Sequence, residues 1–260
     1  MCNNPKVFQI NQQFQAQSEW TALIRNYLFQ EYKISSESLI LEIGCGTGVI
    51  LHDLTMRGYP HLLGVDINYP YLTYAKNYHH LKNLVHGDGF NLPLTSHSVD
   101  VCVFHYLLLW ISPLDKLIQE ALRVVKKDGY IMALAEPDYE ARIDYPPALE
   151  RLGKIQNEAL IKAGVDLSVG RKLKGLFSSN GLREVKGGII GQEWSEAQSL
   201  AEFDFEWKYL ESDLSPYLSV DEIKKLKETD YQSRMANKRI LFIPTFWAVG
   251  RVYRFFGKPT

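Results

Sequence analysis

Apolar runs without alternation recur along the first half of the chain. Residues 39–43 read Leu-Ile-Leu-Glu-Ile, and a run with so few polar positions is typical of a strand covered on both faces in a parallel sheet. Four more strands are expected at 61–65, 84–86, 100–104 and 130–135. Between them the apolar positions follow helical spacing, and this alternation predicts a mostly parallel sheet with helices on both faces.

Helical patterns surround these strands. Residues 12–32 predict an amphipathic helix that covers the sheet before the first strand. Its expected apolar face consists of Trp20, Leu23, Ile24, Tyr27 and Leu28. The helix after the fourth strand has the strongest boundary signals, with Ser112 as the expected N-cap and Pro113 at the first helical position.

A glycine-rich turn follows the first strand directly. Gly44, Gly46 and Gly48 stand at alternate positions after Glu42. Glycines let the chain turn sharply and let another molecule approach the backbone. The next helix begins at Val49, and its N-terminus presents free N–H groups and partial positive charge at the end of the strand. Strand, glycine turn and helix therefore predict a ligand site, although such turns also occur without a ligand.

Two later signals continue this pattern. Asp66 ends the second strand, eighteen positions beyond Gly48, where an acid can accept hydrogen bonds from two ribose hydroxyls. The alternative is that Asp66 only caps the next helix, expected over 71–80. Gly87, Asp88 and Gly89 follow the third strand, and Asp-Gly alone would be an ordinary turn.

In this order, the three signals resemble the class I S-adenosylmethionine-dependent methyltransferases, in particular the type 11 group typified by quinone-biosynthesis methyltransferases. A dinucleotide fingerprint would instead read G-x-G-x-x-G. The resemblance covers about 39–191 and extends weakly to the last strand. It implies S-adenosylmethionine as the cofactor. The cofactor-binding residues that it implies are Glu42, Gly44, Cys45, Gly46, Asp66, Ile67, Asp88, Gly89, Phe90 and His105.

His105 leaves the fourth strand where the resembling family brings backbone to the methionine end of the cofactor. Its carbonyl is expected to accept from the cofactor's ammonium group, and its imidazole is the candidate catalytic base, with an ordinary pKa near 6.5. Glu136 and Asp138, after the fifth strand, are candidates for orienting it or for an alternative base. The alternative is that His105 is only a wall residue.

The second half of the chain departs from a plain nucleotide fold. A sixth strand is expected at 182–190 and a last one at 240–249, where Pro244 indicates a bulge or an edge. The resemblance implies that the last strand runs antiparallel between the fifth and the sixth. We expect one methyltransferase domain over 1–260, with a core of 37–191 plus 239–250 and helical inserts at about 147–163 and 192–238.

The inserts are expected to form a lid over the cofactor. Their aromatic residues are candidates for lining an apolar acceptor pocket, or simply for a core. These residues are Trp194, Phe203, Phe205 and Trp207.

Composition narrows the function further. The 29 basic and 30 acidic residues give a net charge of −1, so nucleic acid is an unlikely partner. Cys2, Cys45 and Cys102 are odd in number and lack metal-ligand spacing, which favours neither disulfides nor zinc and indicates a reducing, cytoplasmic protein. Residues 1–13 lack an apolar signal core, and the apolar run 101–111 is too short to span a bilayer.

The expected reaction is direct in-line methyl transfer, which requires no metal and mainly needs alignment of the acceptor and exclusion of water. The motifs of adenine-amino, cytosine-5 and protein-arginine methyltransferases are absent. A small, fairly apolar acceptor is therefore the favoured substrate class. An RNA or protein methyltransferase and a non-catalytic S-adenosylmethionine-binding or scaffolding protein are the alternatives. The acceptor, the methylated atom and the oligomeric state stay open.

Overall fold

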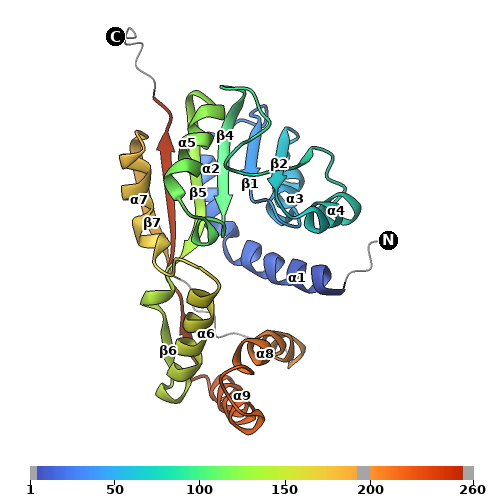
Figure 1. Cartoon of the computed structure of the whole chain (residues 1–260), viewed down its shortest axis with the longest axis vertical. Coiled ribbons are helices and arrows are strands. Elements are labelled where there is room, and N and C mark those ends of the chain that lie inside the picture. The colour runs from blue at the N-terminus through green and yellow to red at the C-terminus, as the bar shows by residue number, and fades with distance from the viewer. Residues whose placement is uncertain (1–4, 192–199, 254–260) are drawn as a thin grey trace. The chain divides into compact units, whose positions relative to one another are not determined.

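A seven-stranded sheet occupies the first of two compact units in this computed structural model, which describes residues 5–191 and 200–253. The sheet order is β3-β2-β1-β4-β5-β9-β7, as Figure 1 shows for the labelled strands. The strands are β1 (Ile40–Ile43), β2 (Leu62–Asp66), β3 (Leu84–His86), β4 (Val99–His105), β5 (Val125–Pro137), β7 (Arg183–Ile190) and β9 (Thr245–Arg251). The predicted mostly parallel sheet is confirmed.

The register at the centre of the sheet is parallel. Ile40 of β1 lies opposite Leu62 of β2 on one side and Val101 of β4 on the other. All four residues of β1 are buried, which explains the apolar run without alternation. Because the neighbours are parallel, their carboxyl ends meet at one edge of the sheet.

The last strand, β9, lies between β5 and β7. At the start of β5, the N–H of Asp128 donates to the carbonyl of Val252, and the N–H of Val252 donates to the carbonyl of Gly129, both at 2.9 Å. The end of β9 thus meets the start of β5, and Figure 1 draws the red strand opposite in direction to β4 and β5. The antiparallel return between the fifth and sixth strands of the sheet is confirmed.

Helices cover both faces of this sheet. The helices of the first unit are α1 (Pro5–Trp20), α2 (Ala22–Glu31), α3 (Val49–Met56), α4 (Tyr69–Tyr78), α5 (Leu114–Val124) and most of α7 (Val169–Ser179), with a 3-10 helix, η1, at Leu108–Trp110. The start of α5 differs from the prediction. Pro113 is its N-cap, with extended backbone and no side-chain cap, so Ser112 lies one position too early to cap it.

The N-terminal segment is two helices, so the prediction of a single helix over 12–32 is wrong. The break lies at Thr21, between α1 and α2. The predicted apolar face is also wrong in part, because Leu23 is 81% exposed and Tyr27 is 51% exposed. The buried face of α2 instead includes Arg25, which can be buried because Asp53 neutralises its charge at 2.8 Å.

The second compact unit comprises residues 137–171 and 189–245. It contains α6 (Glu150–Lys162), α8 (Leu200–Leu214), α9 (Val220–Met235), β6 (Ile143–Tyr145), β8 (Ile240–Phe242) and two 3-10 helices, η2 (Tyr139–Ala141) and η3 (Pro147–Leu149). β6 pairs antiparallel with β8, with Asp144 opposite Leu241. The strand predicted at 240–249 is therefore two strands, since the chain leaves its pairing with β6 before Pro244.

Two of the predicted pocket aromatics lie in the core of the second unit. Phe203 is 4% exposed and Trp207 is fully buried. They pack with Leu152, Ile155, Leu214, Leu218 and Ile223. Trp194 and the side chain of Phe205 lie outside the described residues. For Phe203 and Trp207, core packing is the observed role, and the lid function of the inserts stays a prediction.

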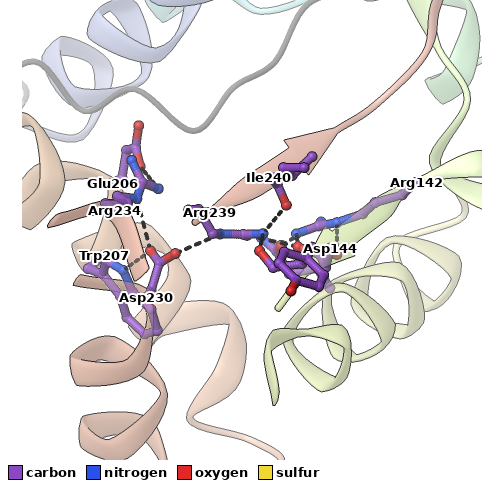
Figure 2. Close-up of polar contacts among 10 residues, drawn as sticks. Arg142, Asp144, Glu206, Trp207, Asp230, Arg234, Arg239 and Ile240 are labelled. Atoms are coloured by element: carbon purple, nitrogen blue, oxygen red, sulfur yellow. Dashed lines mark hydrogen bonds and ion pairs between the residues drawn. The ribbon is translucent and has the colours of Figure 1, made fainter. Parts of the chain in front are cut away.

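A buried ion network joins the elements of the second unit (Figure 2). Arg239 contacts Asp144 of β6 at 2.8 Å and Asp230 of α9 at 2.7 Å. Asp230 also accepts a hydrogen bond from the indole N–H of Trp207 at 2.8 Å and lies 3.3 Å from Arg234. Because each charge has an opposite partner, the network can be buried in this unit.

Candidate active site at the carboxyl edge of the sheet

The glycine-rich turn after β1 adopts the conformation that its spacing predicts. Gly44, Gly46 and Gly48 have φ angles of 72°, 53° and 82°, a left-handed region in which a side chain is strained. The N–H of Gly44 donates to the carbonyl of Val65 at 2.8 Å, which ties the turn to β2. Gly48 is the N-cap of α3 and supplies no side-chain cap. The N–H groups at this helix start therefore lie beside the turn.

Asp66 reaches this turn from the end of β2. Its carboxylate accepts the N–H of Gly46 and the N–H of Asn68, each at 2.7 Å. Burial raises the pKa of Asp66, and these backbone donors partly offset that rise. The alternative role as a helix cap is wrong, because the side chain of Asn68 caps α4 by accepting from Tyr71 at 3.3 Å.

Polar atoms beneath the turn lack partners. Glu42 is 2% exposed, and its Oε2 atom is sealed from solvent without a hydrogen bond. Burial raises the pKa of Glu42 well above its ordinary value, nearby Arg25 lowers it, and Asp66 adds to the rise. The hydroxyl of Thr47 is likewise buried without a partner. Buried polar atoms normally have partners, so the turn retains unused hydrogen-bonding capacity.

The loop after β3 reaches the end of β1. A Cβ on Gly89 would lie 2.9 Å from a methyl carbon of Ile43, so any other residue here would force neighbouring side chains to shift. The side chain of Asp88 is exposed and accepts the N–H of Phe90 at 2.9 Å. Ile67, after β2, is 73% exposed, and its carbonyl lies 2.9 Å from the Nε2 atom of the His86 ring.

The N-terminal helix α1 packs against the turn, which the sequence did not predict. A Cβ on Gly46 would lie 2.9 Å from the ring of Phe14. The same ring packs edge-on against Tyr71 of α4, with 6.0 Å between centroids. In Figure 1, α1 runs past the carboxyl ends of the parallel strands. No spacing pattern connects Phe14 with the glycine motif.

His105 ends β4, and its Nε2 atom lies 2.8 Å from the hydroxyl oxygen of Thr21. Burial, followed by the charge of Arg25, lowers the pKa of His105 to about 3. The imidazole is therefore uncharged at neutral pH, but it is a weaker base than an ordinary histidine. Thr21 and Arg25 are site residues that sequence reasoning missed, because they lie far from every motif.

Glu136 and Asp138 have other partners than expected. Glu136 is fully buried, and its carboxylate accepts the N–H groups of Leu107 and Leu108 at 3.0 and 3.1 Å. Burial raises its pKa to about 7 even though these donors favour the charged form. Asp138 forms an ion pair with Arg171. The observed orienting partner of His105 is Thr21.

All three sequence motifs thus meet at one edge of the sheet, at the ends of β1, β2 and β3. Among the described residues, no group of three or more His, Cys, Asp or Glu side chains is arranged to hold a metal ion. Every helix in the same part of the chain is too short or too polar to cross a membrane. Cys45 and Cys102 are buried free thiols, and Cys2 lies outside the described residues.

Residues 41–133 match the model of a family described as a methyltransferase domain. The chain is similar to malonyl-[acyl-carrier protein] O-methyltransferase of Pectobacterium atrosepticum, with 29% identity over 92 residues, 35% of this chain and 36% of that protein. It is also similar to demethylmenaquinone methyltransferase of Lactobacillus johnsonii, with 28% identity over 115 residues, 41% of this chain and 47% of that protein. The alignments thus span between about a third and a half of these relatives.

Solved structures share the fold. A putative methyltransferase from an antibiotic biosynthesis pathway of Anabaena variabilis gives a TM-score of 0.64 at 17% identity, covering 88% of this chain and 96% of that chain. Phosphoethanolamine N-methyltransferase 2 of Haemonchus contortus, in complex with phosphomonomethylethanolamine and S-adenosylhomocysteine, gives 0.57 at 13% identity, covering 92% and 57%. At these identities the similarity concerns the fold.

Proposed function

We propose that this chain, a class I, type 11 methyltransferase by the match over residues 41–133, transfers a methyl group from S-adenosylmethionine to a small-molecule acceptor. The observation that carries the proposal is the meeting of the left-handed glycine turn with the carboxylate of Asp66, joined through the N–H of Gly46 at 2.7 Å. A backbone turn and an acid at the ends of neighbouring strands suit a nucleoside ligand.

Each cofactor-binding residue has a task in this proposal. Asp66 would accept hydrogen bonds from the ribose hydroxyls, and Gly44 and Gly46 would let the cofactor approach their backbone. Asp88, with its exposed carboxylate, would accept from the adenine amino group, and Ile67 and Phe90 would supply apolar contacts to the base. The remaining first-motif residues, Glu42 and Cys45, shape the turn from below, where both are buried.

The bound cofactor supplies an electrophilic methyl group on a sulfonium, so this chain needs no nucleophile of its own. Its residues hold the acceptor in line and keep water away. The carbonyl of His105 would accept from the cofactor's ammonium group. Its neutral imidazole suits a hydrogen bond to an acceptor hydroxyl better than full proton removal, because its pKa is lowered to about 3.

A small acceptor is supported by the two curated relatives, whose names give a carrier-bound malonyl group and a quinone. Since these acceptors differ in chemistry, the relatives do not select one. The net charge of −1 speaks against a nucleic-acid substrate. A thermal-shift screen of candidate acceptors, run with S-adenosylhomocysteine present, is the direct way to find the acceptor.

Calorimetry with S-adenosylmethionine tests the cofactor site. Asp66→Ala should weaken binding by about 1 to 3 kcal/mol, because hydrogen bonds to a charged group are lost. Asp66→Asn, which keeps one acceptor oxygen, should weaken it less. Asp221→Ala removes an exposed carboxylate from α9 and should leave the affinity unchanged. Equal affinity in a folded Asp66→Ala protein would remove Asp66 from the site, and no binding by the parent protein would end the proposed function.

A further inference from the structure

The hydroxyl of Thr21 does not form the helix-capping hydrogen bond that its position at the start of α2 favours. Thr21 is fully buried and is the N-cap of α2, a position at which threonine normally accepts a backbone N–H of the helix. No such side-chain cap is formed. Instead, its Oγ1 atom lies 2.9 Å from the carbonyl of Gln17 and 2.8 Å from Nε2 of His105.

Counting donors identifies the protonated nitrogen of His105. A threonine hydroxyl has one hydrogen to donate and two lone pairs that accept. Thr21 donates to a carbonyl of α1, either that of Gln17 at 2.9 Å or that of Ser18 at 3.3 Å. Its oxygen also accepts from Nη1 of Arg25 at 3.3 Å. With the hydroxyl hydrogen held by one of these carbonyls, the remaining contact, at 2.8 Å from His105, is a hydrogen bond that Nε2–H donates to Thr21, and this is the arrangement that we take.

The other ring nitrogen, Nδ1, is left with a lone pair. It has no hydrogen-bond partner in the described part of the chain, and it is not among the polar atoms sealed from solvent. Burial, followed by the charge of Arg25 on α2, lowers the pKa of His105 to about 3, so the ring is unprotonated at neutral pH. Nδ1 is thus a neutral acceptor at the carboxyl end of β4.

We propose that Thr21 is a positioning residue that holds His105 as the Nε2–H tautomer, so that Nδ1 accepts a hydrogen bond from an O–H or N–H group of the methyl acceptor. The tautomer rests on the contacts of Thr21, whereas the choice of ligand rests on the proposed function. The proposal also narrows the class of methyl acceptor, because a molecule without an O–H or N–H donor could not give Nδ1 of His105 a hydrogen bond.

The test is long-range proton–nitrogen NMR of the protein labelled at its histidine nitrogens, with His105→Gln assigning the signals. The parent should show Nε2–H in about tenfold excess, the ratio that one net hydrogen bond provides. Thr21→Val has nearly the same shape but cannot accept, so the ratio should fall by about tenfold. Thr21→Ser restores the hydroxyl and should restore the parent pattern. A purely structural role would not separate serine from valine in this spectrum.

The parent spectrum alone can overturn the inference, whether or not Thr21→Val folds. Nδ1–H as the main form, or an unchanged ratio in folded Thr21→Val, would refute it. Calorimetry on the same samples keeps the two proposals apart. A parent that binds S-adenosylmethionine but shows Nδ1–H retains the proposed function and loses this inference. A parent that shows Nε2–H but binds no cofactor keeps the positioning of His105 by Thr21 and loses the proposed function, together with the methyl acceptor as the partner of Nδ1.

Discussion

At the scale of single residues, the site depends on side chains that hold backbone in place. Glu136 is the clearest case, because one buried carboxylate accepts three consecutive N–H groups, those of Leu107, Leu108 and Leu109, at 3.0 to 3.3 Å. These donors begin the short 3-10 helix η1, directly after His105 and Tyr106. Tyr106 has a φ angle of 52°, so the chain turns sharply there and needs a fixed continuation.

Glu136→Ala should therefore lower the free energy of unfolding by about 1 to 3 kcal/mol, because buried N–H groups lose their acceptor. Glu136→Gln is the matched control. It keeps one acceptor oxygen and cannot ionise, so its loss should be smaller. Urea unfolding at pH 7 measures both. Equal losses in the two variants would show that acceptance of the N–H groups is not what Glu136 contributes.

The pH dependence of Glu136 gives a second check on the same residue. Its folded pKa, about 7, lies above the ordinary 4.5. The folded state therefore holds the proton more tightly than the unfolded state, and this contribution to stability is full below pH 4.5 and is lost as the pH rises through 7. Relative to the parent, Glu136→Gln should gain stability between pH 5 and 8. A constant difference over that range would mean that Glu136 is ionised throughout.

At the scale of elements, sequence pattern predicted most of the sheet and less of the helices. The strand at 40–43 was predictable because both of its faces are buried, which removes polar alternation. The break at Thr21 was not, because the apolar spacing continues through it. The sequence pattern placed Pro113 at the first helical position instead of the N-cap, one position away, since proline fits both.

The packing of α1 on α3 and α4 also lies beyond sequence pattern. His79, after α4, lies 3.3 Å from the side-chain oxygen of Asn11 on α1, and its ring centroid is 4.6 Å from that of His52 on α3. Burial, then the nearby His52 and His80, lower the pKa of His79 to about 4. Protonation of His79 therefore works against the contact between these three helices.

Acid should consequently destabilise the protein through His79. Its folded pKa lies below the ordinary 6.5, so the stability that it contributes is full above pH 6.5 and is lost as the pH falls toward 4. Over that range His79→Gln should reduce the dependence of unfolding free energy on pH by at most about 1.4 kcal/mol per pH unit. His61→Gln, at an exposed site, is the control. Parallel pH curves for the parent and His79→Gln would contradict this assignment.

At the scale of the whole molecule, the sequence predicted the carboxyl edge of the sheet, where the cofactor motifs meet, but not the contacts within the second unit. The motifs at Gly44, Asp66 and Asp88 meet because consecutive parallel strands bring their carboxyl ends together. The contacts of the second unit have no such local rule. Arg239 pairs with Asp144, 95 residues earlier, and sequence spacing carries no signal for a pair so distant.

The two compact units should differ in their response to loss of one buried charge. Asp230 is 1% exposed and lies against Arg239 at 2.7 Å and Arg234 at 3.3 Å. Asp230→Asn leaves these cations with less negative charge in a buried place, which costs about 3 to 5 kcal/mol when one partner of a buried pair is removed. The cost falls on the second unit, because all three residues belong to it.

Hydrogen exchange followed by mass spectrometry can locate that cost. In Asp230→Asn, peptides from α8 and α9 should exchange faster, while peptides from β1 and β4 keep the protection of the parent, because local opening is governed by the contacts of each cooperative region. Glu150→Gln, in the exposed ion pair with Lys154 at 3.7 Å on α6, should leave both sets unchanged. Faster exchange in β1 and β4 to the same extent would mean that the units unfold together, and unchanged α8 and α9 would mean that Asp230 is not needed to balance the buried arginines.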